Sequence, residues 1–208
     1  MLKDAWLFIV PVLIVAALVF SSGWTYAWIP ALLLLGLAGF IAFFFRDPVR
    51  QTPAGDDLVV SPADGKVMFV RPVDSGAGEP QNQVSIFLSV FDVHVNRTPI
   101  GGEIKKVAYQ RGKFRNAMAN ESSVENEQNV VTVENERIRV VFSQIAGLIA
   151  RRIVFWFRAG DHVEKGQKVG LIRFGSRTDL FLPVKVEILV RAGDRVRGGV
   201  TVIGKIIS

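Results

Sequence analysis

The chain has 208 residues, half of them hydrophobic, and it carries a formal net charge of +6. This length accommodates one medium domain and a smaller segment. The chain contains no cysteine, which excludes a disulfide framework and thiolate metal sites and agrees with a reducing compartment. Two histidines without cysteines make a poor ligand set, so we expect no metal site.

The N-terminal part of the chain predicts a membrane anchor. No charged residue occurs from Ala5 to Phe45, and about 20 apolar residues suffice for one helix across a bilayer. Ser21-Ser22-Gly23 lies near the middle of this run and can turn the chain. We therefore predict two short transmembrane helices within residues 1–45. The run is too long for a signal peptide, and one long span or a re-entrant loop is the alternative.

The charges that flank this hairpin predict its orientation. Two spans place both ends on one side, where Lys3 precedes the first helix and Arg46 and Arg50 follow the second. Basic residues favour the cytoplasmic side of a membrane. We therefore predict a cell-membrane protein whose linker, residues 46–57, and C-terminal domain, residues 58–208, lie on the cytoplasmic side.

The C-terminal domain has the pattern of a β protein. Short runs rich in Val, Ile and Phe are separated by Gly, Pro, Asp or Asn. Helical periodicity is weak and is best at Gln144–Arg151, where we expect a short helix, and the polar segment Asn116–Asn129 favours a loop. Examples of the predicted strands are Leu58–Val60, Gly65–Val70, Val84–Phe91, Val130–Val133, Arg137–Phe142, Ile153–Phe157, Val184–Val190 and Val200–Ile207.

One internal repeat refines this fold. The hexapeptide from Arg158 to Val163 recurs from Arg191 to Val196, and both copies contain Ala-Gly-Asp. Such a unit suits a tight turn, because glycine accepts positive φ and aspartate bonds nearby backbone amides. The spacing resembles the turn of biotinyl and lipoyl domains. We predict a mainly β, sandwich or barrel-sandwich-like domain with lipoyl-like half repeats.

Many basic residues lie beyond Ala150. For a membrane-tethered domain the simplest partner for this charge is an anionic lipid surface. Nucleic acid is the other standard partner of a basic domain, but we find no recognition helix, zinc spacing or aromatic RNA motif and expect none. A solvated basic face without a specific partner is the plain alternative.

Three residues are candidates for chemistry. Ser176 follows the flexible Gly175 and offers a hydroxyl nucleophile. His94 lies among polar residues that alternate with valines, which places the polar side chains on one face of an extended chain. Asp64 sits on a Pro/Asp/Gly turn and could orient an imidazole. The plain alternatives are an ordinary strand-end histidine and a simple turn. The second histidine, His162, belongs to a repeat turn and is expected to be exposed.

Five motifs along the chain resemble, in the same order, those of the phosphatidylserine decarboxylase proenzymes. They are FFFRDPVRQTP, SPADGKV, FLSVFDVHVNRTP, QIAGLIARRI and GLIRFGSRTDLFLP. The resemblance implies that Ser176 attacks the carbonyl of Gly175, so that the chain separates into a β chain, 1–175, and an α chain, 176–208. Ser176 would become an N-terminal pyruvoyl group, with Asp64 and His94 completing a protease-like triad.

The resemblance also implies the reaction and its partners. The pyruvoyl group would accept the electron pair left when CO2 departs from a serine phospholipid, which yields phosphatidylethanolamine. His94 would protonate the product carbanion, and Arg97 and Arg177 are candidates for the lipid phosphate. The two fragments would stay together as a heterodimer, and assembly of several copies is compatible with the sequence.

One position departs from the family pattern. Longer bacterial members carry a second histidine three residues after the first, where this chain has Arg97. Arginine is not a plausible base. Either His94 serves both cleavage and decarboxylation, or another group assists cleavage. An inactive family member and a membrane-tethered, lipoyl-like, non-catalytic interaction domain are the competing hypotheses.

Overall fold

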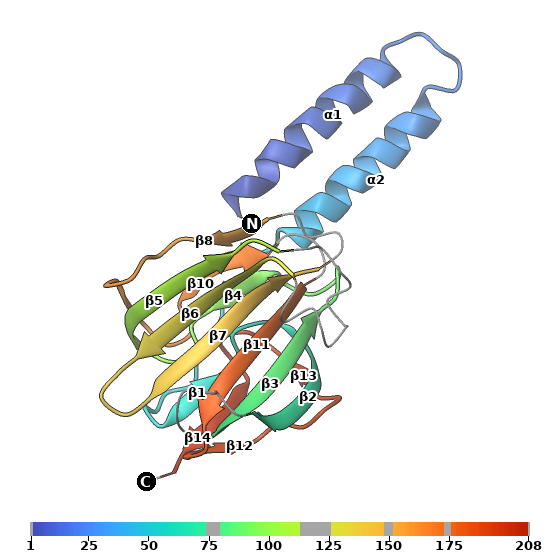
Figure 1. Cartoon of the computed structure of the whole chain (residues 1–208). Helices are drawn as coiled ribbons and strands as arrows, with labels where there is room; N and C mark the ends of the chain where they lie inside the picture. The colour runs from blue at the N-terminus through green and yellow to red at the C-terminus, as the bar shows by residue number, and fades with distance from the viewer. Residues whose placement is uncertain (1, 74–79, 113–125, 148–151, 173–175, 208) are drawn as a thin grey trace. The chain divides into compact units, whose positions relative to one another are not determined.

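The computed structural model describes residues 2–73, 80–112, 126–147, 152–172 and 176–207. The chain divides into two compact units, Met1–Val49 and Arg50–Ser208. The first unit is helical, and the second consists of β-strands (Figure 1).

The first unit is a helical hairpin. A 3-10 turn, Lys3–Ala5, leads into α1 (Trp6–Phe20), and α2 (Trp28–Phe44) packs against α1. The turn between the helices contains Gly23 at a φ of +75°. The segment Lys3–Phe20 has a mean hydropathy of 2.1 and is only 17% buried, so its length and composition allow it to cross a membrane; α2 is apolar and slightly shorter.

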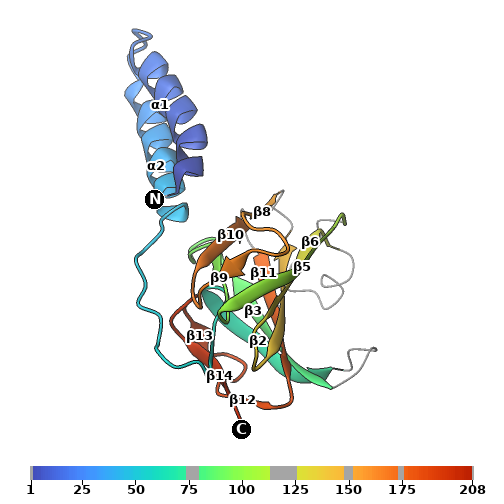
Figure 2. The same cartoon turned by 90° about the vertical axis from the view of Figure 1, so that its left-hand side faces the viewer.

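The second unit is built around one large antiparallel sheet that curls on itself (Figures 1 and 2). Its strand order is β13-β2-β3-β11-β7-β6-β5-β9. This arrangement confirms the prediction of a mainly β domain. The bounds are β2 Gly65–Val73, β3 Gln81–Leu88, β5 Gly102–Gln110, β6 Gln128–Glu134, β7 Arg139–Ala146, β9 His162–Val163, β11 Ser176–Pro183 and β13 Arg195–Val196.

Two three-stranded sheets complete this unit, with orders β1-β14-β12 and β4-β10-β8. All their pairings are antiparallel. Their bounds are β1 Leu58–Val60, β14 Val202–Ile206, β12 Val186–Ile188, β4 Val95–Arg97, β10 Lys168–Ile172 and β8 Ile153–Phe155.

The inner face of the large sheet changes from apolar to polar along its strands. One cross-strand row consists of Val131, Phe142 and Leu180, which are fully buried in the main core. Two residues further along each strand, the same face carries a row of polar residues, Asn129, Gln144 and Thr178, which are also buried. Buried polar groups require hydrogen-bond partners, so this end of the core is where a polar site can be built.

The two repeated turns have the same structure. The carboxylate of Asp161 accepts a 2.8 Å hydrogen bond from the backbone of Arg158, and that of Asp194 accepts one of 3.0 Å from Arg191. Each turn then leads into a two-residue strand, β9 or β13, which pairs with the start of β5 or β2. The predicted half repeats are therefore confirmed.

Two predictions of local structure differ from the structure. A helix was predicted for Gln144–Arg151, but Gln144–Ala146 forms the end of β7, because β6 and β11 pair with this segment on both sides. Residues 148–151 lie outside the described residues. A loop was predicted for Asn116–Asn129, but Gln128 and Asn129 are the first two residues of β6. Residues 113–125 lie outside the described residues. Within the sheet, the side-chain amide of Gln128 donates a 3.1 Å hydrogen bond to Gln110, and that of Asn129 donates one of 3.0 Å to Gln144.

Candidate active site

Ser176 lies at the polar end of the core. It is the first residue of β11 and stands between Leu88 of β3 and Ala146 of β7. The residue is fully buried, and its Oγ has no hydrogen-bond partner among the described residues. A buried polar group without a partner costs about 1–3 kcal/mol, so a role other than stability is indicated. Gly175, the residue before it, lies outside the described residues.

His94 immediately precedes β4 and is 2% exposed. Its Nδ1 lies 3.0 Å from the carbonyl oxygen of Asp92. A carbonyl only accepts, so this contact requires the proton on Nδ1 and leaves the lone pair of a neutral ring on Nε2. The backbone oxygen of His94 accepts a 3.3 Å hydrogen bond from Ile172, the last described residue before Ser176. The chain thus brings a histidine with a defined tautomer into the neighbourhood of the serine.

Asp64 is held on both of its oxygens. Oδ1 accepts a 2.7 Å hydrogen bond from the backbone of Gly198, and Oδ2 accepts one of 2.8 Å from Nη2 of Arg50. The side chains of Arg50 and Asp64 are 11% and 14% exposed. Among the described residues these two groups, and not His94, bind the carboxylate. The predicted contact between Asp64 and His94 is therefore not formed in this structure.

Asn96 connects the segments that carry the three candidates. Its Nδ2 lies 3.2 Å from Oγ1 of Thr178 on β11 and 3.4 Å from the carbonyl oxygen of Pro62, in the turn of Asp64. Its Oδ1 accepts a 3.0 Å hydrogen bond from Gln144. The turn of Asp64, β4 and β11 therefore meet at one buried amide. The alternating pattern indicated a polar face at Asn96, but it named no partner.

The turn that carries Asp64 has a counterpart elsewhere in the domain, and the comparison shows which residues such a turn requires. Ser61-Pro62-Ala63-Asp64-Gly65 leads into β2, and Thr98-Pro99-Ile100-Gly101-Gly102 leads into β5. The two segments exchange equivalent 2.9 Å backbone hydrogen bonds, from Val60 to Pro99 and from Arg97 to Pro62. Since Gly101 occupies the position of Asp64, this turn forms without a carboxylate. The acid at Asp64 is therefore not explained by the turn alone.

The two arginines predicted to bind phosphate are bonded within the protein. Nη1 of Arg97 donates a 2.9 Å hydrogen bond to the carbonyl of Gly166, and the residue is 9% exposed. Arg177 is fully buried, and its Nε and Nη2 lie 2.6 and 2.8 Å from the two oxygens of Asp179. The geometry gives neither of them an exposed guanidinium.

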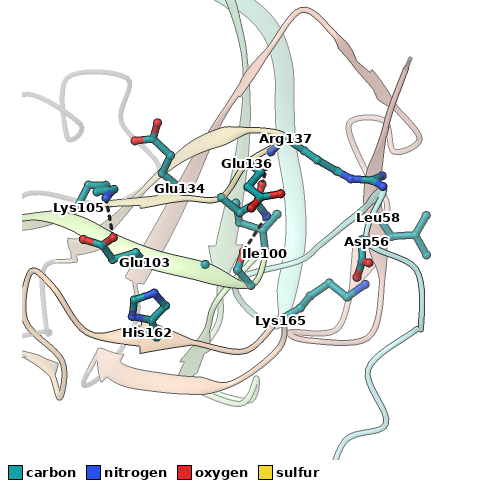
Figure 3. A pocket seen from close by; sticks show the side chains of 13 residues that line it. Asp56, Leu58, Ile100, Glu103, Lys105, Glu134, Glu136, Arg137, His162 and Lys165 are labelled. Carbon is teal, nitrogen blue, oxygen red and sulfur yellow. Dashed lines mark hydrogen bonds and ion pairs between the residues drawn. The ribbon is translucent and has the colours of Figure 1, made fainter.

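A cavity of about 670 Å³ lies elsewhere in the second unit (Figure 3). Its described lining includes Glu103 and His162, but not Asp64, His94 or Ser176. Lys105 donates a 2.6 Å hydrogen bond to Glu103, which lowers the pKa of that carboxyl. His162 is exposed at the start of β9, as expected for a turn residue. The cavity and the candidate site are therefore lined by different residues.

The fold defines the class of this protein, a mainly β protein that carries an apolar helical segment. The chain matches the family described as Phosphatidylserine decarboxylase over residues 37–204. It therefore belongs to the phosphatidylserine decarboxylase family, whose members are carboxy-lyases.

Several relatives bear the name phosphatidylserine decarboxylase proenzyme. The one from Solibacter usitatus is 53% identical over 175 residues, which is 84% of this chain and 83% of the relative. The one from Symbiobacterium thermophilum is 47% identical over 207 residues, covering 98% of this chain and 94% of the relative. The one from Magnetococcus marinus is 45% identical over 189 residues, covering 89% and 87%.

Proposed function

We propose that this chain is a pyruvoyl-dependent phosphatidylserine decarboxylase that first cleaves itself between Gly175 and Ser176. The name proenzyme, given to its relatives, supports processing of the chain. The observation that carries the proposal is the buried Oγ of Ser176, which has no hydrogen-bond partner among the described residues. A hydroxyl kept in this state is available as a nucleophile.

The cleavage can be written with the groups of this chain. Oγ of Ser176 attacks the carbonyl carbon of Gly175 while its proton passes to Nε2 of His94. The peptide C–N bond then breaks, the proton moves to the released nitrogen, and an ester remains. Loss of the α-proton of Ser176 expels the carboxylate of Gly175 and leaves dehydroalanine. Tautomerisation and addition of water release ammonia and leave the pyruvoyl group.

A pyruvoyl group fits the place of Ser176. It carries a methyl group where serine has a hydroxymethyl group, and the hydroxyl that is lost has no partner among the described residues. When present, the group supplies the electron sink for decarboxylation. His94 would hold the proton that the product receives, with its ring oriented by the carbonyl of Asp92. Asp64 would supply a fixed negative charge.

Sheet pairing supports a stable complex of the two fragments. β11 would belong to the α chain, yet it lies between β3 and β7 of the β chain. β13 and β14 would likewise pair with β2 and β1. Separation would break these ladders, so the fragments are expected to remain a heterodimer.

The proposal includes the place of the enzyme in the cell. The helical hairpin would hold the β unit at the cell membrane, where its anionic serine phospholipid is found. The basic residues Lys3, Arg46 and Arg50 support a cytoplasmic position for residues 58–208.

The test is the intact mass of the purified chain under denaturing conditions. We expect wild-type protein to give two fragments, with the smaller one lighter than the plain hydrolysis product by one ammonia. Ser176→Ala should give one chain of 23.0 kDa. Ser85→Ala is the matched control, because Ser85 is also fully buried on a neighbouring strand, and it should be cut normally. An uncut wild-type chain would contradict the proposal.

A further inference from the structure

Glu127 lies in line with Ser176 across the large sheet. Ser176 of β11 stands opposite Ala146 of β7. The backbone N–H of Ala146 donates a 2.9 Å hydrogen bond to the carbonyl of Glu127, the residue that precedes β6. We propose that the carboxylate of Glu127 is the base that removes the α-proton of Ser176 in the elimination step of self-cleavage. This inference rests on the proposed function, because it assigns a base to one step of that cleavage.

The alternation of side chains places Glu127 on the inner face of the sheet, which also carries Ser176. Asn129 belongs to the buried polar row that includes Thr178. Side chains two positions apart in a strand share a face, so Glu127 and Ser176 lie on this face one row further along. Both residues are buried, Glu127 with 8% exposure. Ala146 stands between them with only a methyl group, so no large side chain of β7 separates them.

The pairing of β7 directs the α-proton of Ser176 toward the side on which Glu127 lies. Both polar backbone groups of Ala146 point away from β11, because its N–H bonds to Glu127 and its carbonyl accepts a 2.8 Å hydrogen bond from Nδ2 of Asn126. Ser176 and Ala146 therefore form a non-hydrogen-bonded pair, in which the Cα atoms approach to about 4.5 Å and the Cα–H bonds face each other. The α-proton of Ser176 thus points to β7 and not to β3.

The carboxylate of Glu127 can reach this proton. The three segments lie side by side in the sheet (Figure 1), and two strand spacings of about 10 Å in total separate the Cα atoms of Ser176 and Glu127. A glutamate side chain that extends over Ala146 covers about half of this span, and a general base acts either directly or through one water molecule. Burying a carboxylate is costly, so its place beside Ser176 needs a reason other than packing.

Tyr109 helps to position this carboxylate. It stands directly opposite Asn129 on β5 and so shares the inner face. Burial, and next to it the adjacent carboxylate of Glu127, raise the pKa of the Tyr109 hydroxyl, which therefore stays protonated at neutral pH. A protonated phenol can donate a hydrogen bond to a carboxylate. Both oxygens of Asp64 are already bonded, to Arg50 and to the backbone of Gly198, which favours Glu127 as the proton acceptor.

One proton moves to Glu127 and returns in this step. The ester of the cleavage joins the carbonyl carbon of Gly175 to Oγ of Ser176. Glu127 takes the α-proton, the C–H electron pair forms the double bond between Cα and Cβ, and the Cβ–Oγ bond breaks to release the carboxylate of Gly175. When the resulting dehydroalanine tautomerises, the proton passes from Glu127 to Cβ, which becomes the methyl group. Glu127 thus ends as a carboxylate again.

The test uses hydroxylamine, which cuts an ester but not an ordinary peptide bond. The chain contains no Asn-Gly bond, the one peptide bond that this reagent also attacks readily. In the full chain carrying Glu127→Gln, the pyruvoyl group should form at least about 100-fold more slowly than in wild type, because a general base contributes about 10²–10⁴-fold. Hydroxylamine should then release a β fragment that ends in a hydroxamate at Gly175 and an α fragment that begins with intact serine. Both products are identified by mass.

Two further variants are the controls. Glu134→Gln is the same substitution at the other end of β6, where the carboxylate pairs with Arg139, and it should form the pyruvoyl group at the wild-type rate. Glu127→Gln combined with Ser176→Ala should resist hydroxylamine, since no ester can form without the hydroxyl of Ser176.

Formation of the pyruvoyl group in Glu127→Gln at the wild-type rate would overturn the proposal. Glu127→Asp, which keeps a carboxylate of shorter reach, decides the case in which Glu127→Gln does not fold. A slowed Glu127→Asp chain that hydroxylamine cuts at Gly175 would support the proposal, and resistance of both variants to hydroxylamine would overturn it.

The wild-type chain keeps this proposal distinct from the proposed function. A wild-type chain that stays uncut and also resists hydroxylamine would contradict the proposed function. A wild-type chain that is cut at Gly175, together with a Glu127→Gln chain that is cut equally fast, would contradict the role of Glu127 alone.

Discussion

The carboxylate of Asp64 is held in place by Arg50, a residue that lies outside the predicted strands. Arg50 comes from the polar linker, and its guanidinium is bonded to the carboxylate at 2.8 Å with both side chains largely buried. Removing one partner of such a pair leaves a poorly solvated charge. The same residue thus serves to attach the linker and to hold the candidate acid.

The change Arg50→Gln should slow self-cleavage about tenfold, since a hydrogen bond to a charged group is worth about 1.5–3 kcal/mol. Arg50→Lys should recover part of the rate because it keeps the charge. The measurement is the fragment fraction against time by mass spectrometry. Arg158→Gln is the control, at a side chain that is 90% exposed. Cleavage of Arg50→Gln at the wild-type rate would exclude this role.

Asn96 offers a second prediction for a single side chain. Asn96→Leu keeps a similar volume but leaves the amide of Gln144 and the hydroxyl of Thr178 without their partner in this network. We expect the free energy of unfolding to fall by about 2 kcal/mol. Denaturant unfolding in the Ser176→Ala background measures this loss without interference from cleavage. An unchanged midpoint would show that the network does not contribute to stability.

At the scale of elements, the fold consists of two similar halves that differ where the site lies. The turn at Arg158–Asp161 docks on β5 through a 2.8 Å hydrogen bond from Gly160 to Ile104. The turn at Arg191–Asp194 docks on β2 through one of 2.8 Å from Gly193 to Val67. The halves diverge at Asp64, which corresponds to Gly101. A common scaffold therefore carries the candidate acid in one half only.

The equivalence of the two turns can be measured. Gly160 and Gly193 have φ values of +94° and +98°, and an added Cβ would contact nothing within 4 Å at either position. The substitutions Gly160→Ala and Gly193→Ala should therefore each cost only the backbone term, about 1–2 kcal/mol. Thermal unfolding of both variants should give similar shifts. A loss confined to one variant would show that the turns are not energetically equivalent.

At the scale of the whole molecule, the prediction concerns the orientation of the hairpin. Two spans would expose Ser22 on the outer side and Val49 on the cytoplasmic side. Ser22→Cys and Val49→Cys place single thiols in a chain that has none, and Val49 is 98% exposed. A membrane-impermeant maleimide applied to intact cells should label only Ser22→Cys, and both after lysis. Labelling of Val49→Cys in intact cells would reverse the orientation.

Local patterns explain why much of the fold was predictable. The strands rich in Val, Ile and Phe were recognised because their composition is itself the signal. β11 was not among the predicted strands, and it carries two charged residues, Arg177 and Asp179. Their charges are paired with each other within the strand. The helix expected at Gln144–Arg151 was wrong at its start because pairing to two neighbouring strands outweighs local preference.

The sequence by itself determined the apolar helices, the repeated turns, the β character of the domain and the candidate residues Asp64, His94 and Ser176. Each of these rests on neighbouring residues, whose properties act over a few positions. The partners of the candidates were decided only by the tertiary structure. The amide of Asn96 meets Thr178 across 82 positions, and Gly198 reaches Asp64 across 134. Such contacts depend on the register and curl of the sheet, which no local pattern specifies.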